Sequence, residues 1–170
     1  MSPREIRIYD DPVLGTRAEE VTTFDADLRT LAGDMLETMD NAGGVGLAAN
    51  QVGIVKRIFV YDCSHTQSGL RGAIVNPVWE PVGTQEQTGP EGCLSIPGIS
   101  AETTRYNQVF VSGRDIEGRP VSMMASGLMA RCIQHETDHL DGVLFLQRLE
   151  ASVRKDALRA IRESAWFNAS

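Results

Sequence analysis

The chain has 170 residues, of which 42% are hydrophobic and 23% are charged, and its formal net charge is −7. This length predicts a single domain, residues 1–170, around one core, and the acidic charge argues against a surface that binds DNA. No apolar run approaches the roughly 18–20 residues that cross a membrane, and the N-terminus lacks the apolar stretch of a signal peptide, so we expect a cytoplasmic protein with no membrane partner.

The first predicted element is a helix from Asp25 to Ala42. Apolar residues recur along it at helical spacing, and Gly43 and Gly44 follow as a stop signal. The apolar positions are Leu28, Leu31, Ala32, Met35, Leu36 and Met39.

A glycine-rich segment, Gly44 to Gln51, comes directly after this helix. It superficially matches the G-x-G-x-x-A pattern of dinucleotide-binding sites. That pattern must follow a strand and open a helix, whereas here a helix precedes it and no clear helix follows, so we reject a nucleotide site. The glycines indicate a place where backbone comes close to another group. The Gln51 side chain is either a donor to a developing oxyanion or a satisfied loop amide.

Strands are predicted next, from Lys56 to Asp62 and from Gly72 to Glu80. The segment from Asn107 to Ala125 predicts a hairpin, with Glu117 and Gly118 in its turn. Because the strands are grouped between helices and do not alternate regularly with them, the pattern indicates an α+β fold.

The strongest chemical signal lies in the next helix, predicted from Leu128 to Leu140. It contains an H-E-x-x-H motif, whose two histidines, His135 and His139, lie on one helical face and can bind one divalent metal. Glu136 is placed to take a proton from a water that a metal activates. A chance pair of surface histidines is the alternative, but the apolar residues before the motif predict a buried helix, in which unpaired histidines are costly.

Catalytic metal sites usually have a third protein ligand. His65 lies in a polar segment and is more consistent with a solvated loop. Cys132 precedes His139 by about 10 Å along the helix axis, too far to share one metal with both histidines, and we interpret it as a buried structural cysteine. Elimination leaves Cys93, although a cysteine between small and apolar residues is usually part of a core.

A last helix is predicted from Leu149 to Trp166. It is locally basic within an acidic chain, and a solvated face with ion pairs between successive turns is the simplest explanation. The basic residues in and before it are Arg148, Arg154, Lys155, Arg159 and Arg162.

Three segments together resemble the peptide deformylase family. Its members share G-x-G-L-A-A-x-Q, E-G-C-L-S and Q-H-E-x-D-H-L segments in this order, and the chain carries them at residues 44–51, 91–95 and 134–140. The early Asp11-Pro12-Val13-Leu14 is also similar to the family's N-terminal pattern, so the resemblance covers nearly the whole chain. Residues 98–100, Gly-Ile-Ser, lack the arginine with which some bacterial members hold the peptide.

The resemblance implies an α+β fold with antiparallel sheets packed around a central metal-binding helix, and a helical C-terminus. It implies that Cys93, His135 and His139 bind one divalent metal, Fe²⁺ physiologically, which Zn²⁺, Ni²⁺ or Co²⁺ can replace. It also implies removal of the formyl group from the N-terminal formyl-methionine of newly made polypeptides, and it suggests that the last helix docks near the ribosomal exit tunnel.

Roles for other residues follow from this resemblance. Glu136 is expected to act as general base and then as general acid. The Gln51 side-chain amide and the backbone N–H of Leu94 are expected to stabilise the oxyanion. Val45, Gly46 and Ile133 are candidate substrate-binding residues, and both Val45 and Ile133 are equally compatible with ordinary core positions.

Three alternatives remain at this point. An H-E-x-x-H metalloprotease usually completes its site with Glu or His, so Cys93 counts against it. A catalytically silent binding protein would have lost Glu136 or a ligand, and none is lost. A deformylase that acts on a small N-formyl metabolite would use identical chemistry, and the sequence does not exclude it.

Overall fold

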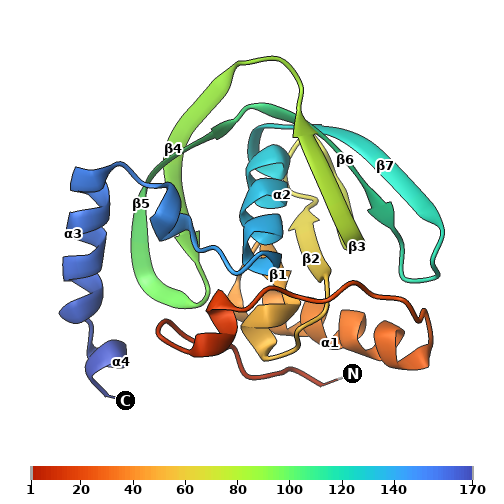
Figure 1. The fold of residues 1–170 in the computed structure, drawn as a ribbon, viewed down its shortest axis with the longest axis horizontal. Helices are drawn as coiled ribbons and strands as arrows, with labels where there is room; N and C mark the ends of the chain where they lie inside the picture. The colour runs from red at the N-terminus through yellow and green to blue at the C-terminus, as the bar shows by residue number, and fades with distance from the viewer. Residues whose placement is uncertain (1, 170) are drawn as a thin grey trace.

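Two antiparallel sheets form the body of the protein in the computed structural model, which describes residues 2–169 (Figure 1). One has five strands in the order β1-β2-β3-β6-β7, and the other is the β4-β5 hairpin. The strands are β1 (Gly46–Ala48), β2 (Ile58–Cys63), β3 (Leu70–Pro81), β4 (Glu86–Cys93), β5 (Ile96–Tyr106), β6 (Gln108–Arg114) and β7 (Pro120–Ser126). The helices are α1 (Ala26–Ala42), α2 (Gly127–Leu140), α3 (Ala151–Arg162) and α4 (Ala165–Asn168), with short 3-10 turns η1 (Pro12–Gly15), η2 (Ala49–Val52) and η3 (Phe145–Arg148). None of the described helices has the length and apolar character that crossing a membrane requires.

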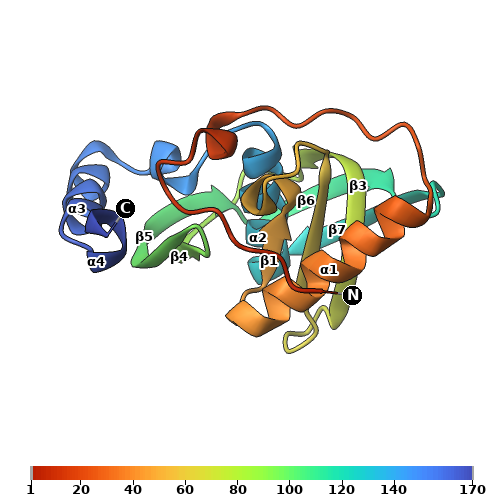
Figure 2. The same cartoon turned by 90° about the horizontal axis from the view of Figure 1, so that it is seen from below.

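Helix α2 lies between the five-stranded sheet and the β4-β5 hairpin (Figures 1 and 2). It is buried continuously from Met129 to Leu140, which confirms the predicted buried histidine helix. Its apolar residues join Phe59 and Ile74 in the core on the sheet side. Its polar residues are buried as well, so each of them needs a hydrogen-bonding or ionic partner inside the protein.

Helix α1 packs against β1 and β2 and closes the opposite side of the sheet core. The Asp25 carboxylate caps its first turn by accepting a hydrogen bond from the Leu28 N–H at 3.1 Å. Gly43 ends the helix with φ +70°, a conformation that glycine adopts without steric cost. The predicted helix from Asp25 to Ala42 is therefore confirmed, together with its buried face.

The strand predictions are confirmed for part of the fold. The segments 56–62 and 72–80 correspond to β2 and β3, and the segment 107–125 forms the β6-β7 hairpin with Glu117 and Gly118 in its turn. The sequence did not predict β1 or the β4-β5 hairpin. In this hairpin the buried positions include Glu91, Thr103 and Arg105, so the apolar alternation that marks a strand is absent.

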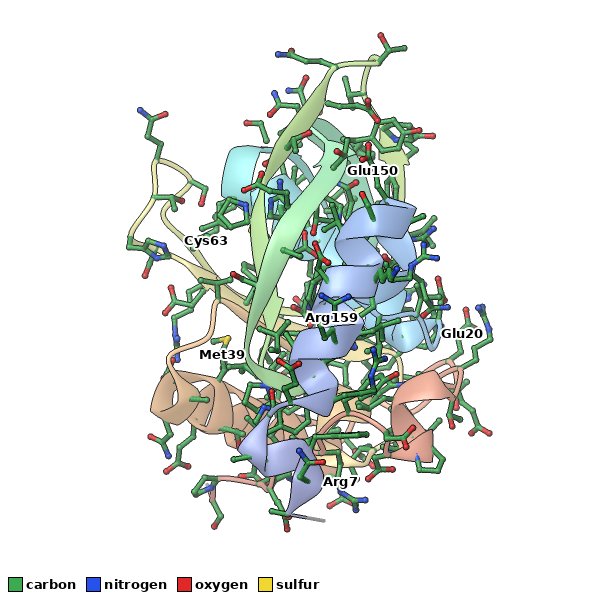
Figure 3. All side chains as sticks on the ribbon, turned by 90° about the vertical axis from the view of Figure 1, so that its left-hand side faces the viewer. Arg7, Glu20, Met39, Cys63, Glu150 and Arg159 are labelled. Atoms are coloured by element: carbon green, nitrogen blue, oxygen red, sulfur yellow. The ribbon has the colours of Figure 1, made fainter. Side chains whose placement is uncertain are left out.

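The predicted final helix from Leu149 to Trp166 is too long. Helix α3 ends at Arg162, and the chain turns at Ser164 before the short α4. The turn lets the Trp166 indole N–H donate to the Pro97 carbonyl at the start of β5, at 2.8 Å. Figure 3 shows α3 in front of the β4-β5 hairpin, with Glu150 before its first turn.

Substitution of Gly142, just after α2, tests how tightly the N-terminal segment packs against the end of this helix. It has φ +76°, and a Cβ at this position would lie 2.6 Å from the Gly15 carbonyl oxygen. Gly142→Ala therefore strains the backbone and forces η1 away, and we expect it to lower the free energy of unfolding by about 2–4 kcal/mol.

Gly69→Ala is the matched control for this change. Gly69 has φ +62° but open space around it, so only the conformational cost of about 1 kcal/mol applies. Urea denaturation of the metal-loaded proteins measures both values. Equal losses in the two variants would contradict the close approach at Gly142.

Candidate metal centre

Two elements bring three ligand atoms together. Helix α2 carries His135 and His139 one turn apart, and the tip of the β4-β5 hairpin carries Cys93. The Cys93 Sγ lies 3.3 Å from the His139 Nε2, which lies 3.2 Å from the His135 Nε2. All three ligand atoms lie within 4.8 Å of one another. The structure thus assembles the predicted ligand set from segments that are about 40 residues apart in the chain.

This cluster fits one divalent metal. A thiolate and two imidazoles are the donor set that zinc and ferrous iron accept. Both imidazoles are buried, whereas Cys93 is partly exposed at the wall of a pocket, which leaves room for an open coordination position. Two predicted exclusions also hold: the Cys132 thiol points to the Val45 carbonyl oxygen at 3.6 Å, outside the cluster, and His65 lies exposed in the turn after β2.

The carboxylate of Glu91 orients the first histidine. Its Oε2 lies 2.7 Å from the His135 Nδ1, and Arg105 donates two hydrogen bonds to the same carboxylate, at 2.6 and 3.1 Å. Burial opposes ionisation of Glu91, but the hydrogen bonds from His135 and Arg105 outweigh it and hold its pKa well below the usual range. An ionised Glu91 only accepts, so His135 carries its proton on Nδ1, and the lone pair of its Nε2 would be free to bind a metal.

Sequence reasoning assigned no role to Glu91 or Arg105. Glu91 was visible in the segment that contains Cys93, and a charged residue two positions before a ligand is a usable signal. Arg105 had no such signal, because only the pairing of β5 with β4 places it opposite α2. There it also binds Asp138 at 2.8 Å, the acidic residue beside His139.

The electrostatics of Glu136 and His139 suit proton transfer and metal binding, whereas the neighbouring Glu136, Cys93 and Glu91 raise the pKa of His135 against the effect of its burial. Burial raises the pKa of Glu136 to about 7, and its Oε1 has no hydrogen-bond partner in the described part of the chain. A carboxyl group with this pKa exchanges protons readily near neutral pH. Burial and the neighbouring His135 lower the pKa of His139, which keeps it in the neutral form that a metal ligand needs.

Gln51 and Leu94 both adjoin Cys93, Gln51 through its side chain and Leu94 as the next residue of the chain. The Gln51 side-chain oxygen accepts from the Ala48 N–H at 2.9 Å, which fixes the direction of the amide. Its Nε2 donates to the Ser95 Oγ at 3.0 Å and to the Cys93 Sγ at 3.6 Å. Leu94 follows Cys93 in the hairpin turn, so both predicted oxyanion donors lie beside the ligands.

The glycine-rich segment approaches α2 closely, as its composition indicated. A Cβ on Gly46 would lie 2.5 Å from the Glu136 Oε2 and 2.9 Å from the Cys132 Sγ. A Cβ on Gly44 would lie 2.7 Å from the Leu94 Cδ1. Any larger residue at Gly46 would displace the carboxylate from its position next to the cluster.

A pocket of about 480 Å³ opens beside the cluster. It is lined by the predicted Val45 and Gly46 and by residues of the hairpin, and α2 contributes Leu128, Arg131, Cys132, His135 and Glu136. The structure does not bring Ile133, the third predicted substrate-binding residue, into this lining. Ile133 is fully buried in the sheet-side core and lies outside the pocket lining that the described residues form, because two positions along a helix turn its side chain to the opposite face from His135.

Fold and site together define a metal-dependent hydrolase: a buried H-E-x-x-H helix, a cysteine from a facing hairpin, and an acid beside an open pocket. The chain belongs to the polypeptide deformylase family, whose model matches residues 3–155. It is 63% identical over 168 residues to peptide deformylase 1 of Corynebacterium efficiens, and 62% identical over 168 residues to peptide deformylase 1 of Corynebacterium glutamicum, with 99% of each chain covered in both cases. The solved structure of a peptide deformylase from Legionella pneumophila is 38% identical, with a TM-score of 0.89 over 99% of this chain and 98% of that one.

Replacement of single thiols tests the ligand set. We expect Cys93→Ser to lose most of its bound metal, because an alcohol is a far weaker ligand than a thiolate. Cys132→Ser, the matched control, is expected to keep one metal per chain, since its thiol points to a backbone carbonyl. Metal content after gel filtration measures both, and equal metal loss in the two variants would exclude Cys93 as a specific ligand.

Proposed function

We propose that this protein removes the formyl group from the N-terminal formyl-methionine of newly made polypeptides, with one divalent metal held by Cys93, His135 and His139. The observation that carries the proposal is the convergence of these ligands beside Glu136 and an open pocket, in a chain of the polypeptide deformylase family. We propose Fe²⁺ as the physiological metal, replaceable by Zn²⁺, Ni²⁺ or Co²⁺, and the cytoplasm as the location.

The steps of formyl hydrolysis are assigned to residues beside the ligand cluster. A divalent metal held by Cys93, His135 and His139 would act as a Lewis acid towards the formyl carbonyl and would make water more acidic. Glu136 takes the proton of the attacking water and delivers it to the leaving amine, so the products are formate and a free N-terminus. As the carbonyl oxygen gains negative charge, the Gln51 Nε2 and the Leu94 backbone N–H donate hydrogen bonds to it.

The lining of the pocket supports a substrate that begins with methionine. Val45, Leu128 and Cys132 provide apolar surface for a methionine side chain next to the ligands. The matching family and the similar Corynebacterium efficiens chain are named as deformylases of polypeptides or peptides, and neither name supports a small N-formyl metabolite as the substrate. Rates for formyl-Met-Ala-Ser and for free formyl-methionine test this point: faster hydrolysis of the free amino acid would overturn the proposed polypeptide substrate.

Glu136→Ala tests the proton-transfer role. We expect the variant to keep its metal, because the ligands are other residues, and to lose about 10²–10⁴-fold in kcat, the usual contribution of general acid–base catalysis. Thr137→Val is the matched control on the same helix, because it removes a buried hydroxyl that has no partner in the described part of the chain. The measurement is deformylation of formyl-Met-Ala-Ser at equal metal content, and near-normal turnover of Glu136→Ala would remove this residue from the mechanism.

Docking of α3 near the ribosomal exit tunnel is a second proposal, which concerns partners. Two of the five basic residues are used within the protein, since Arg148 pairs with Asp138 and Arg154 donates to backbone carbonyls of the preceding turn. Lys155, Arg159 and Arg162 remain exposed at helical spacing, on one face. Such a stripe suits contact with ribosomal RNA phosphates.

Charge reversal tests the ribosome contact. We expect the triple change of Lys155, Arg159 and Arg162 to Glu to abolish co-sedimentation with ribosomes at low salt, because phosphate contacts depend on these charges. Lys56→Glu, a change of an exposed cation just before β2, is the control and should leave co-sedimentation intact. Unchanged sedimentation of the triple variant would count against docking through α3.

A further inference from the structure

Arg131 is a cation in the pocket wall that the proposed chemistry does not use. It lies in α2 one turn before His135, and its side chain is only 9% exposed. Its Nη1 donates to the Glu91 Oε1 at 2.7 Å. Within residues 2–169 no acceptor meets its Nε or Nη2, and neither atom is fully buried. Arg131 lines the pocket, so its unpaired donors lie at or near the pocket wall, with Nη2 3.7 Å from the place that a Cβ on Gly89 would occupy.

The ionic cluster around Arg131 contains more guanidinium groups than carboxylates. Arg105 binds both Glu91 and Asp138, and Arg148 adds two hydrogen bonds to Asp138, at 2.9 and 3.0 Å. Three guanidinium groups therefore face two carboxylates in this cluster. Both carboxylates keep an arginine partner without Arg131, so its charge and its remaining donors are available to a ligand.

The position of Arg131 indicates which part of a substrate it meets. Arg131 precedes His135 by four positions, about 6 Å along the helix axis. The formyl group lies at the ligand cluster, and several bonds separate it from the end of the first side chain. With the formyl group at the ligand cluster, that end, rather than the peptide backbone, would therefore lie beside Arg131 and its neighbours Leu128 and Cys132 in the pocket lining.

We propose that Arg131 makes this pocket accept a first residue whose side chain ends in a hydrogen-bond acceptor, specifically oxidised methionine, the sulfoxide. The inference rests on the proposed deformylase function and extends its substrate class. A thioether is a weak acceptor and gains little from a guanidinium, whereas oxidation turns it into a strongly polar group. In a purely apolar pocket the sulfoxide oxygen would be desolvated without a partner, but here a charged donor compensates for that loss.

Three peptides that differ only in the first residue test the proposal: formyl-norleucine, formyl-methionine and formyl-methionine sulfoxide, each followed by Ala-Ser. With the metal-loaded protein we expect kcat/KM for the sulfoxide peptide to lie within about threefold of the norleucine peptide. Arg131→Leu and Arg131→Lys should lower this ratio by about tenfold or more, because the Leu variant has no donor and the Lys variant uses its single ammonium group on Glu91. Because the donor stands on one wall, the two sulfoxide epimers should also differ in rate.

Arg148→Lys is the matched control, since Arg148 belongs to the same ionic cluster but is half exposed and lies outside the pocket lining that the described residues form. It should leave the ratio unchanged. Circular dichroism and metal content identify folded variants. If Arg131→Leu does not fold, the proposal is tested by the sulfoxide-to-norleucine ratio of kcat/KM in wild type and in Arg131→Lys. A wild-type ratio below about one thirtieth, or the same ratio in wild type and a folded Arg131 variant, would overturn the proposal.

Binding of the deformylated products separates this inference from the proposed function. Titration calorimetry of Met-Ala-Ser and its sulfoxide into the metal-loaded protein reports on Arg131 without any turnover. If wild type hydrolyses none of the formyl peptides, the proposed function fails. Tighter binding of the sulfoxide product to wild type than to Arg131→Lys supports the pocket assignment in either case, and equal binding to both contradicts it.

Discussion

The buried carboxylate of Glu91 is the interaction on which the site depends. It accepts hydrogen bonds from Arg105 and Arg131, and it lies 2.7 Å from the His135 Nδ1. These partners come from β5 and α2, so one anion joins the hairpin that carries Cys93 to the helix that carries both histidines. Removal of either side would leave a charge buried without its partner, which is far more costly than loss of a surface ion pair.

This arrangement follows from placing a polar helix in a protein interior. Along α2 the residues from Gln134 to His139 are polar and buried, and the β4-β5 hairpin supplies many of their partners. The hairpin therefore buries charged groups where a strand usually buries apolar ones. The same burial raises the pKa of Glu136 towards neutrality and lowers that of His139, so the forces that fit the helix into the core also prepare it for chemistry.

Close backbone approach is the second requirement of the site. Gly46 leaves the space that Glu136 and Cys132 occupy, and the Gln51 amide is fixed by the Ala48 backbone a few residues later. One short segment thus forms a wall of the pocket, an oxyanion donor and the contact with α2. The lining of the resulting pocket combines apolar Val45 and Leu128 with the guanidinium of Arg131, and this mixed lining is the basis for extending the proposed substrate class beyond methionine itself.

The sequence by itself determined the local chemistry. Helical spacing put His135 and His139 on one face, and axial distance excluded Cys132. The extent of α1, its stop at Gly43 and the turn at Gly118 were also predicted correctly, because these features depend on neighbours within a few residues. Only the tertiary structure decided the rest. The β4-β5 hairpin buries ionic groups, so no hydrophobic period marks it, and the roles of Glu91, Arg105 and Arg131 exist only once its strands pair and pack against α2. The burial of Ile133 in the core and the end of α3 at Arg162 have a similar reason, because both depend on packing partners that are distant in the chain.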